Sequence, residues 1–182
     1  MANQPHPFFI TLASTVRTNR QLAAVLLSEH PNLITIRGCD GQTVLHEAVA
    51  WNDPEAVRFV LARGADANAA TDHGSTALID AAKCGLHEIC RILLDHGARI
   101  ATREVSGDTA LSGAALMSRY DVVGLLLSHL GSEDVNQHFD DFNAAALHRC
   151  QAGPITDLLR LRGLRDPLPE GEVAELELVA VG

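Results

Sequence analysis

The sequence has few aromatic residues and almost no lysine. Phe, Trp and Tyr together make up 4% of the 182 residues, so the interior must be built from Leu, Ala, Val and Ile side chains. Small aliphatic side chains allow neighbouring helices to pack closely. Lys83 is the only lysine, and the rest of the 14 Lys and Arg residues are arginines.

Long apolar runs and a basic leader are also missing. No stretch approaches the run of about 18 apolar residues that a membrane-spanning helix requires. Residues 1–7 lack the basic stretch that precedes the apolar run of a signal peptide. The cysteines Cys39, Cys84, Cys90 and Cys150 form no Cys-x-x-Cys pair and are too sparse for a disulfide scaffold. We therefore expect a soluble, cytoplasmic protein that makes no membrane contact.

Basic residues are fewer than acidic ones. The chain has 14 Lys and Arg against 23 Asp and Glu, which gives a formal net charge of −9. Broad nucleic-acid binding needs a basic face for the phosphates, so we expect no nucleic-acid partner. The apolar fraction of 47% and the charged fraction of 20% are ordinary for a globular protein with a real core. At about 150 residues per domain, the length allows one domain or one short array of small units.

A sequence pattern recurs at a spacing of 33 residues. Segments 41–45, 74–78 and 107–111 share Gly at the first position, Thr at the third and Leu at the fifth. Further residues keep the same spacing: Ala48, Ala81 and Ala114; Leu61, Leu94 and Leu127. So many agreements at one period indicate an internal structural repeat.

Each repeat predicts two helices followed by a turn. A Thr precedes the first apolar stretch, where its hydroxyl can cap free N–H groups: Thr43, Thr76 and Thr109. Residues that tolerate a left-handed backbone then break the chain: Asn52, Gly85 and Ser118. Apolar residues at helical spacing follow, and Gly64 and Gly97 close the second helix.

These residues resemble the ankyrin repeat. The pattern Gly41-x-Thr43-x-Leu45-His46-x-Ala48, followed by Gly64-Ala65-Asp66-x-Asn68, is similar to the family's motif, and the resemblance is good over residues 38–136. It implies an all-α ankyrin-repeat solenoid of stacked helix-turn-helix units with β-turn fingers. It also implies that the fingers and first helices form a concave binding surface, and that the protein is not an enzyme.

The predicted domain organisation follows from the same period. We expect an ankyrin repeat domain over residues 1–165 and an acidic tail over residues 166–182. The domain divides into a divergent cap repeat and four full or nearly full repeats: 7–36, 38–70, 71–103, 104–138 and 139–165. Two interpretations of the tail stay open, namely a disordered acidic segment and a strand or clamp that folds onto the last repeat or a partner.

The chain departs from the family's pattern at the residue that follows the motif Leu. His46 keeps the family's His, which usually takes part in a hydrogen-bond network between neighbouring repeats. Ile79 and Ser112 occupy that position in the next two repeats. We therefore expect looser junctions between the central repeats.

No catalytic or metal-binding motif is complete. His46-Glu47 and His87-Glu88 each begin the His-Glu-x-x-His zinc motif, but Ala50 and Arg91 occupy its last position. A Gly-x-Ser-x-Gly nucleophile motif and a Gly-rich phosphate loop are also missing. We predict no catalytic residue, no metal site and no cofactor.

The resemblance implies a set of partner-binding positions. They lie in the fingers and at the exposed ends of the first helices: Arg37, Asp40, Gln42, Trp51, His73, Lys83, Arg103, Asp108, Met117, Asp141 and Phe142. Large aromatic side chains and Met are enriched at the energetic centres of interfaces. Alternatives stay open, because Trp51 and Met117 could instead pack against neighbouring repeats and Phe142 could bury itself to anchor a lengthened finger.

The predicted function is a non-catalytic module that binds a protein partner through its finger and first-helix surface and can thereby regulate it. The acidic balance favours a neutral or basic partner. We expect a monomer when the protein is free. The alternatives are an inhibitor or neutraliser of a partner enzyme or toxin, and a secreted bacterial effector.

Overall fold

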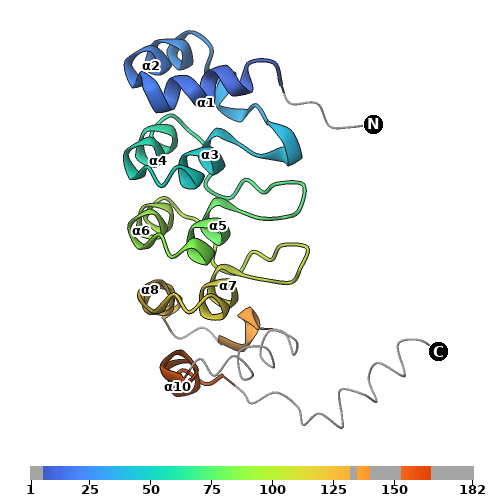
Figure 1. The fold of residues 1–182 in the computed structure, drawn as a ribbon, viewed down its shortest axis with the longest axis vertical. Coiled ribbons are helices and arrows are strands. Elements are labelled where there is room, and N and C mark those ends of the chain that lie inside the picture. The colour runs from blue at the N-terminus through green and yellow to red at the C-terminus, as the bar shows by residue number, and fades with distance from the viewer. Residues whose placement is uncertain (1–5, 132–134, 140–152, 165–182) are drawn as a thin grey trace, which may run out of the picture.

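The computed structural model describes residues 6–131, 135–139 and 153–164. Helices pack in consecutive pairs (Figure 1), listed here with their bounds: α1 (Phe9–Thr18) with α2 (Arg20–Glu29), α3 (Val44–Ala50) with α4 (Pro54–Leu61), α5 (Ala77–Cys84) with α6 (His87–Asp95), and α7 (Ala110–Leu116) with α8 (Tyr120–Leu130). Single-turn helices η1 (Pro31–Thr35), η2 (Cys39–Gly41) and η3 (Val135–His138) and a further helix, α10 (Gly153–Leu161), complete the described elements. These residues contain no strand, only an isolated bridge between Ala70 and Thr76, so the all-α prediction is confirmed.

The pairs stack into two layers of helices. The first helices α1, α3, α5 and α7 contact one another in order, and the second helices α4, α6 and α8 do the same. The loops before the first helices project away from the helix pairs (Figure 1). We call these loops finger 1 (residues 37–43), finger 2 (70–76) and finger 3 (103–109). This arrangement places the fingers and first helices on one side and the second helices on the other.

The local signals in the sequence position the helices as predicted. Thr76 and Thr109 accept hydrogen bonds from the N–H groups of Ile79 and Ser112, the third residues of α5 and α7. The predicted breaks all have positive φ angles, at 52° for Asn52, 78° for Gly85 and 55° for Ser118. Only left-handed backbone turns the chain sharply enough here, and Gly and Asn adopt it at low cost.

The terminal segments differ in part from what the sequence predicts. Within the cap repeat, the sequence pattern predicts a break over residues 19–21 between two helices. The structure has this helix pair, but only Asn19, which caps the Leu22 N–H, breaks the chain, and α2 begins at Arg20. Near the other end, the spacing of Ile155, Leu158 and Leu159 predicts the second helix of the fourth repeat, and these residues lie in α10. Residues 140–152 and 165 of that repeat, and the acidic tail over 166–182, lie outside the described residues.

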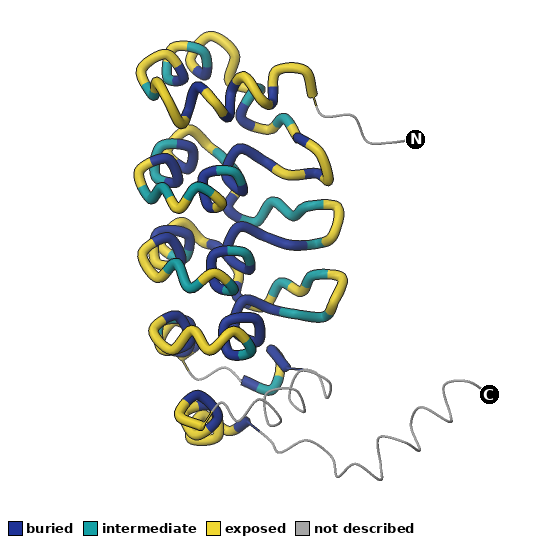
Figure 2. Tube along the Cα trace, viewed as in Figure 1, coloured by how far each residue is buried: buried dark blue, intermediate teal, exposed yellow. Residues whose placement is uncertain are grey.

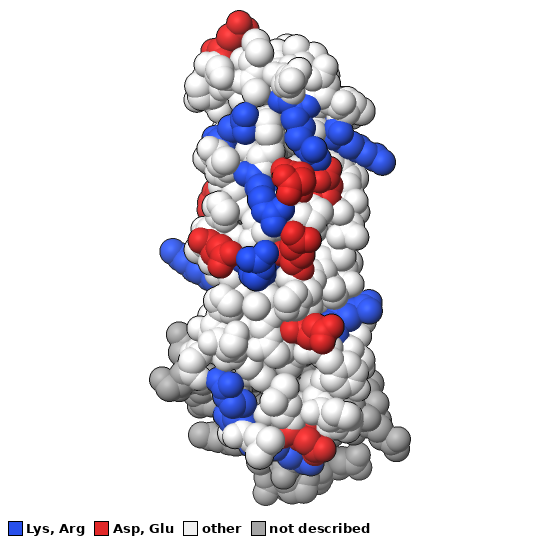
Figure 3. Space-filling model, turned by 90° about the vertical axis from the view of Figure 1, so that its left-hand side faces the viewer, with Lys and Arg blue, Asp and Glu red and all other residues white. Residues whose placement is uncertain are grey.

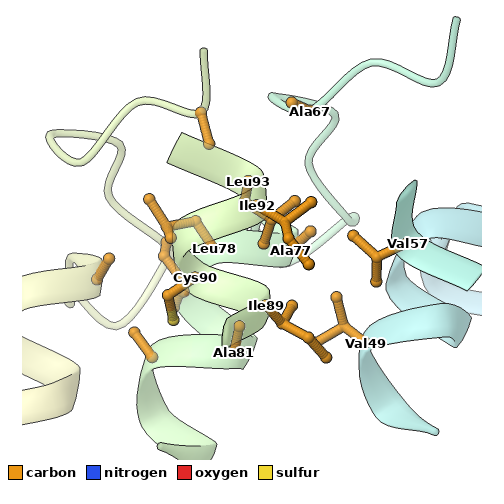
Figure 4. Close-up of a cluster of buried hydrophobic side chains, with 14 of the residues drawn as sticks. Val49, Val57, Ala67, Ala77, Leu78, Ala81, Ile89, Cys90, Ile92 and Leu93 are labelled. Carbon is orange, nitrogen blue, oxygen red and sulfur yellow. The ribbon is translucent and has the colours of Figure 1, made fainter. Parts of the chain in front are cut away.

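The core runs continuously along the stack. Figure 2 shows buried positions recurring in each helix pair, while the finger tips are exposed. Leu45, Leu78 and Leu111 occupy one repeat position and are at most 1% exposed. Figure 4 shows Leu78, with Leu93 of the neighbouring helix, inside a cluster made of aliphatic side chains and Cys90. Burial also raises the pKa of the Cys90 thiol to about 12, so this cysteine packs as a small apolar residue.

The expectation of looser central junctions is wrong. Ile79 and Ser112 have no exposed surface, and the contact between α5 and α7 is the most extensive between any two described helices. Ile79 replaces a hydrogen bond by apolar burial. An ion-pair cluster around Lys83, described below, also joins these two repeats.

Candidate protein-binding surface

The fingers are fixed to one another through their backbones. Finger 2 is closed by hydrogen bonds from Thr71 N–H to Ser75 O and from Gly74 N–H to Thr71 O, both 2.9 Å long. The Asp72 N–H donates to Asp40 O of finger 1 at 2.8 Å, and the Val105 N–H of finger 3 donates to His73 O at 2.9 Å. The finger surface is therefore ordered before any partner binds.

Two predicted site residues brace the fingers. The Arg37 guanidinium donates to Gly41 O at 2.7 Å and to Ala70 O of the next finger at 2.6 Å. Arg103 repeats this arrangement, donating to Gly107 O and to Gln137 O at 2.6 Å each. Both side chains lie at the surface, and each donates two hydrogen bonds within the protein.

Lys83 and Asp108 lie together with Glu104, which sequence reasoning missed. Lys83 Nζ forms ion pairs with Glu104 and, at 3.0 Å, with Asp108 Oδ2. Burial works against ionisation of both Lys83 and Glu104, but their mutual hydrogen bonds and charges outweigh it. The pKa of Lys83 is therefore raised and that of Glu104 lowered. The cluster joins α5 to finger 3.

Four of the other predicted residues are exposed. Asp40, Gln42 and His73 are exposed in the fingers. Met117, at the end of α7, is 53% exposed, so it is available to a partner. Trp51 is half-buried beside α1, with the guanidinium carbon of Arg17 5.5 Å from the ring centroid. Asp141 and Phe142 lie outside the described residues.

Two adjoining hollows lie along the first helices, and the sequence prediction did not include them. The aromatic hollow, between α1 and α3, has a volume of about 320 Å³ and is lined by Phe9, Ile10, Ala13, Arg17, Glu47 and Trp51, among others. The acidic hollow, between α3 and α5, has a volume of about 390 Å³ and is lined by Gln42, His46, Glu47, Ala50, Asp80 and Lys83, among others. Glu47 lines both hollows, so they adjoin across the three first helices, and we call the pair the groove.

The acidic hollow has carboxylates that form no ion pair with any described residue. Glu47 makes no ion pair with any described residue, and Asp80 accepts a hydrogen bond from Ser75 Oγ at 2.6 Å without an ion pair in the same part of the chain. His46 contributes no opposing charge, because burial lowers its pKa despite the nearby Asp80 carboxylate and Ser75 carbonyl. The hollow therefore presents carboxylate charge that the protein itself leaves uncompensated.

The second-helix side has a different character. Figure 3 shows acidic and basic side chains interspersed over this face. Many of them are paired, as in Arg58 with Glu88 of the next repeat at 2.8 Å and Arg91 with Asp95 at 3.7 Å.

A hollow of about 600 Å³ lies at the N-terminal end of the stack, lined by Phe8, Leu26 and Leu33 among others, away from the fingers.

The described residues offer no metal centre and no membrane span. Within residues 6–131, 135–139 and 153–164, no three His, Cys, Asp or Glu side chains gather where they could hold a metal ion. In the same part of the chain, every helix is too short or too polar to cross a bilayer.

Comparison with known families agrees with this architecture. A family model for three copies of ankyrin repeats matches residues 64–139, and a model for one ankyrin repeat matches residues 40–72. The chain belongs to the ankyrin repeat family. No curated protein matches the chain. Ankyrin repeats generally mediate protein–protein interactions, and the family is generally non-catalytic. The matched residues include finger 1 from Asp40 onward and the whole of fingers 2 and 3. They also include α3 and α5, two of the three first helices that line the groove.

Proposed function

We propose that this ankyrin repeat protein is a non-catalytic cytoplasmic module that binds one protein partner through its fingers and first helices. The observation that carries the proposal is the combination of interlocked fingers with an adjoining groove on the same side of the stack. A preformed surface avoids the entropic cost of ordering loops on binding. Binding then regulates the partner by covering part of its surface.

Charge supports a neutral or basic partner. The chain carries a net charge of −9, and Glu47 and Asp80 lie unpaired in the groove among the described residues. Lys83, the only Lys or Arg among the described residues that line the acidic hollow, is offset by Glu104 and Asp108. Complementary charge would steer a basic partner toward this side and slow its dissociation. The free protein is proposed to be a monomer.

Site-specific photo-crosslinking tests the binding side. A photoreactive phenylalanine analogue is placed at His73, which is exposed in finger 2, and in a separate variant at Arg91, which is exposed on α6. After irradiation in extract of the cells that make the protein, we expect a discrete crosslinked protein with the His73 variant and none with the Arg91 variant. Mass spectrometry then identifies the partner and its charge.

The controls make the result decisive. Both variants must show the helical circular dichroism and melting temperature of the unmodified protein. Crosslinking from Arg91 alone, or equally from both positions, would contradict the proposed binding side. An activity assay on the identified partner, with and without the ankyrin protein, then separates simple binding from inhibition.

A further inference from the structure

The groove offers two chemically different places for a bound chain. In the aromatic hollow, Ile10 is 69% exposed and lies with Phe9 and Trp51 around one cavity. A large apolar side chain placed there would cover Ile10 and the half-buried Trp51 ring, and each buried Å² of apolar surface contributes roughly 25 cal/mol. Arg17 borders the hollow, with its guanidinium held over the Trp51 ring.

The acidic hollow suits a cation. Ala50, a small residue, lines this hollow together with Glu47 and Asp80. Neither carboxylate is ion-paired within the described residues, and Lys83 is held by its own two carboxylates. The guanidinium of Arg or the ammonium of Lys would supply the missing charge, and charge-assisted hydrogen bonds are the strongest type available at such a site.

The geometry sets the distance between these two side chains. The hollows lie one first helix apart, because α1 and α3 flank one and α3 and α5 flank the other. Packed helices are spaced by about 8–10 Å, and a chain in the polyproline II conformation advances about 3.1 Å per residue with three residues per turn. Three residues of such a chain therefore cover the step, and the side chains at its two ends point to the same side. Volumes of about 320 and 390 Å³ suit single side chains, one in each hollow.

We propose that the partner presents a segment in the polyproline II conformation with a large apolar residue and an Arg or Lys three positions apart. The apolar side chain occupies the aromatic hollow and the basic side chain lies between Glu47 and Asp80 in the acidic hollow. This inference rests on the proposed function and specifies the partner segment that the groove recognises.

Selection from a library of random 12-residue peptides displayed on phage tests the proposal. The full-length protein is the immobilised target, in three forms: wild type, the double variant Glu47→Gln with Asp80→Asn, and Asp121→Asn. The double variant removes the charges of the acidic hollow and keeps its shape. Asp121, exposed on α8 and not ion-paired among the described residues, is the matched control for a change of acidic charge.

The proposal predicts a distinct pattern for each target. Wild type and Asp121→Asn enrich peptides with a large apolar residue and an Arg or Lys three positions away. The double variant retains the apolar preference and loses the basic one, and the affinity of a selected peptide falls roughly tenfold, as expected for loss of one charge-assisted contact. No enrichment, a basic preference that survives in the double variant, or a seven-residue spacing typical of a bound helix would each overturn it.

Trp51 gives a second, direct readout. It is the only tryptophan of the chain, so its emission reports on the aromatic hollow alone. Selected peptides should shift this emission saturably, and replacing their apolar residue by Ser should abolish the shift. An unchanged emission at saturating peptide would overturn the placement.

The natural partner separates this inference from the proposed function. If the partner crosslinks at His73 but binds the Glu47→Gln/Asp80→Asn variant as tightly as wild type, the binding side stands and the groove proposal fails. If the partner crosslinks from α6 instead, the proposed function itself fails.

Discussion

Two neighbouring junctions of the stack use the same repeat positions in different ways. At the α5–finger 3 junction, Lys83 is paired with Glu104 and Asp108. One repeat earlier in the numbering, these positions are Ala50, Thr71 and Ser75. The ionic cluster is thus replaced by small neutral residues, and the acidic hollow lies at that junction instead.

The comparison shows that a few repeat positions decide whether a junction is filled or open. Both junctions share the same buried Leu and Ala positions. A long charged side chain then fills the space between first helices, or a small one leaves it free. Binding capacity can therefore change from repeat to repeat without any change in the fold.

The largest expected effect comes from the core that both junctions share. Leu78→Ala should lower the free energy of unfolding by about 2–5 kcal/mol, because Leu78 is fully buried in the cluster behind α5. Urea unfolding followed by circular dichroism measures the change. The control is Leu161→Ala on α10, which is 84% exposed and should change stability by less than about 0.5 kcal/mol. Equal effects of the two substitutions would contradict the assigned core.

Removing Lys83 breaks the filled junction. Lys83→Ala should cost about 1–3 kcal/mol, because Glu104 and Asp108, whose side chains are 14% and 16% exposed, lose their counter-ion. Chemical denaturation in urea is again the measurement. Arg58→Ala on α4 also removes ion pairs, but exposed ones, so its effect should be smaller and should vanish at high salt. A larger cost for Arg58→Ala would reverse the comparison.

The ion-pair contribution should depend on pH in a defined way. The lowered pKa of Glu104 gives stability that is present above the unfolded value of about 4.3 and is lost as pH falls through the folded pKa. The raised pKa of Lys83 gives stability that is present below about 10.4 and is lost as pH rises through the folded pKa. The stability difference between wild type and Lys83→Ala should thus be level from about pH 5 to 10 and shrink outside this range. A difference that does not change down to about pH 3 would contradict the assignment.

His46 and Ile79 should differ in their response to acid. His46 Nδ1 accepts from Thr43 N–H at 3.2 Å, so Nε2–H faces Ser75 O at 3.3 Å, and burial lowers the pKa of the ring. The unfolded chain therefore takes up the proton first, and stability falls as pH drops below about 6.5, by at most about 1.4 kcal/mol per pH unit. Unfolding measured from pH 7.5 to 5 should show this slope reduced in His46→Gln and unchanged in Ile79→Val. An identical slope in His46→Gln would place the titrating group elsewhere.

The smallest effect on stability is expected from filling the open junction. Ala50→Lys should change the free energy of unfolding by less than about 0.5 kcal/mol, because position 50 is exposed at the end of α3. The new ammonium group would lie near Glu47 and Asp80 and occupy the acidic hollow. Peptide selection on this variant should therefore lose its preference for Arg or Lys. A preserved preference would show that the hollow is not where the basic residue binds.

Sequence reasoning predicted the parts of this protein that depend on local, periodic signals. The Thr caps and the left-handed breaks at Asn52, Gly85 and Ser118 recur at one spacing, so the amino-acid sequence alone locates the helix pairs. Each such signal acts within a few residues of the chain, which is why it is readable from sequence.

The candidate site was less predictable, because its properties depend on contacts between repeats. Arg37 and Arg103 occupy partner-contacting positions in the family's pattern, yet their guanidinium groups brace neighbouring fingers. Glu47 was not selected, although it lines both hollows. Comparing Ala50 with Lys83 one period later was the available signal, since a small neutral residue at the position of a long charged one marks an open junction.

Hydrogen–deuterium exchange of the protein with and without its crosslinked partner, once that partner is identified and purified, tests the central claim most directly. Amides of fingers 2 and 3 should exchange more slowly in the complex, as should those at the ends of α1, α3 and α5 that border the groove. Those of α4 and α6 should be unchanged. Protection confined to α4 and α6, with fingers that exchange as in the free protein, would contradict the account.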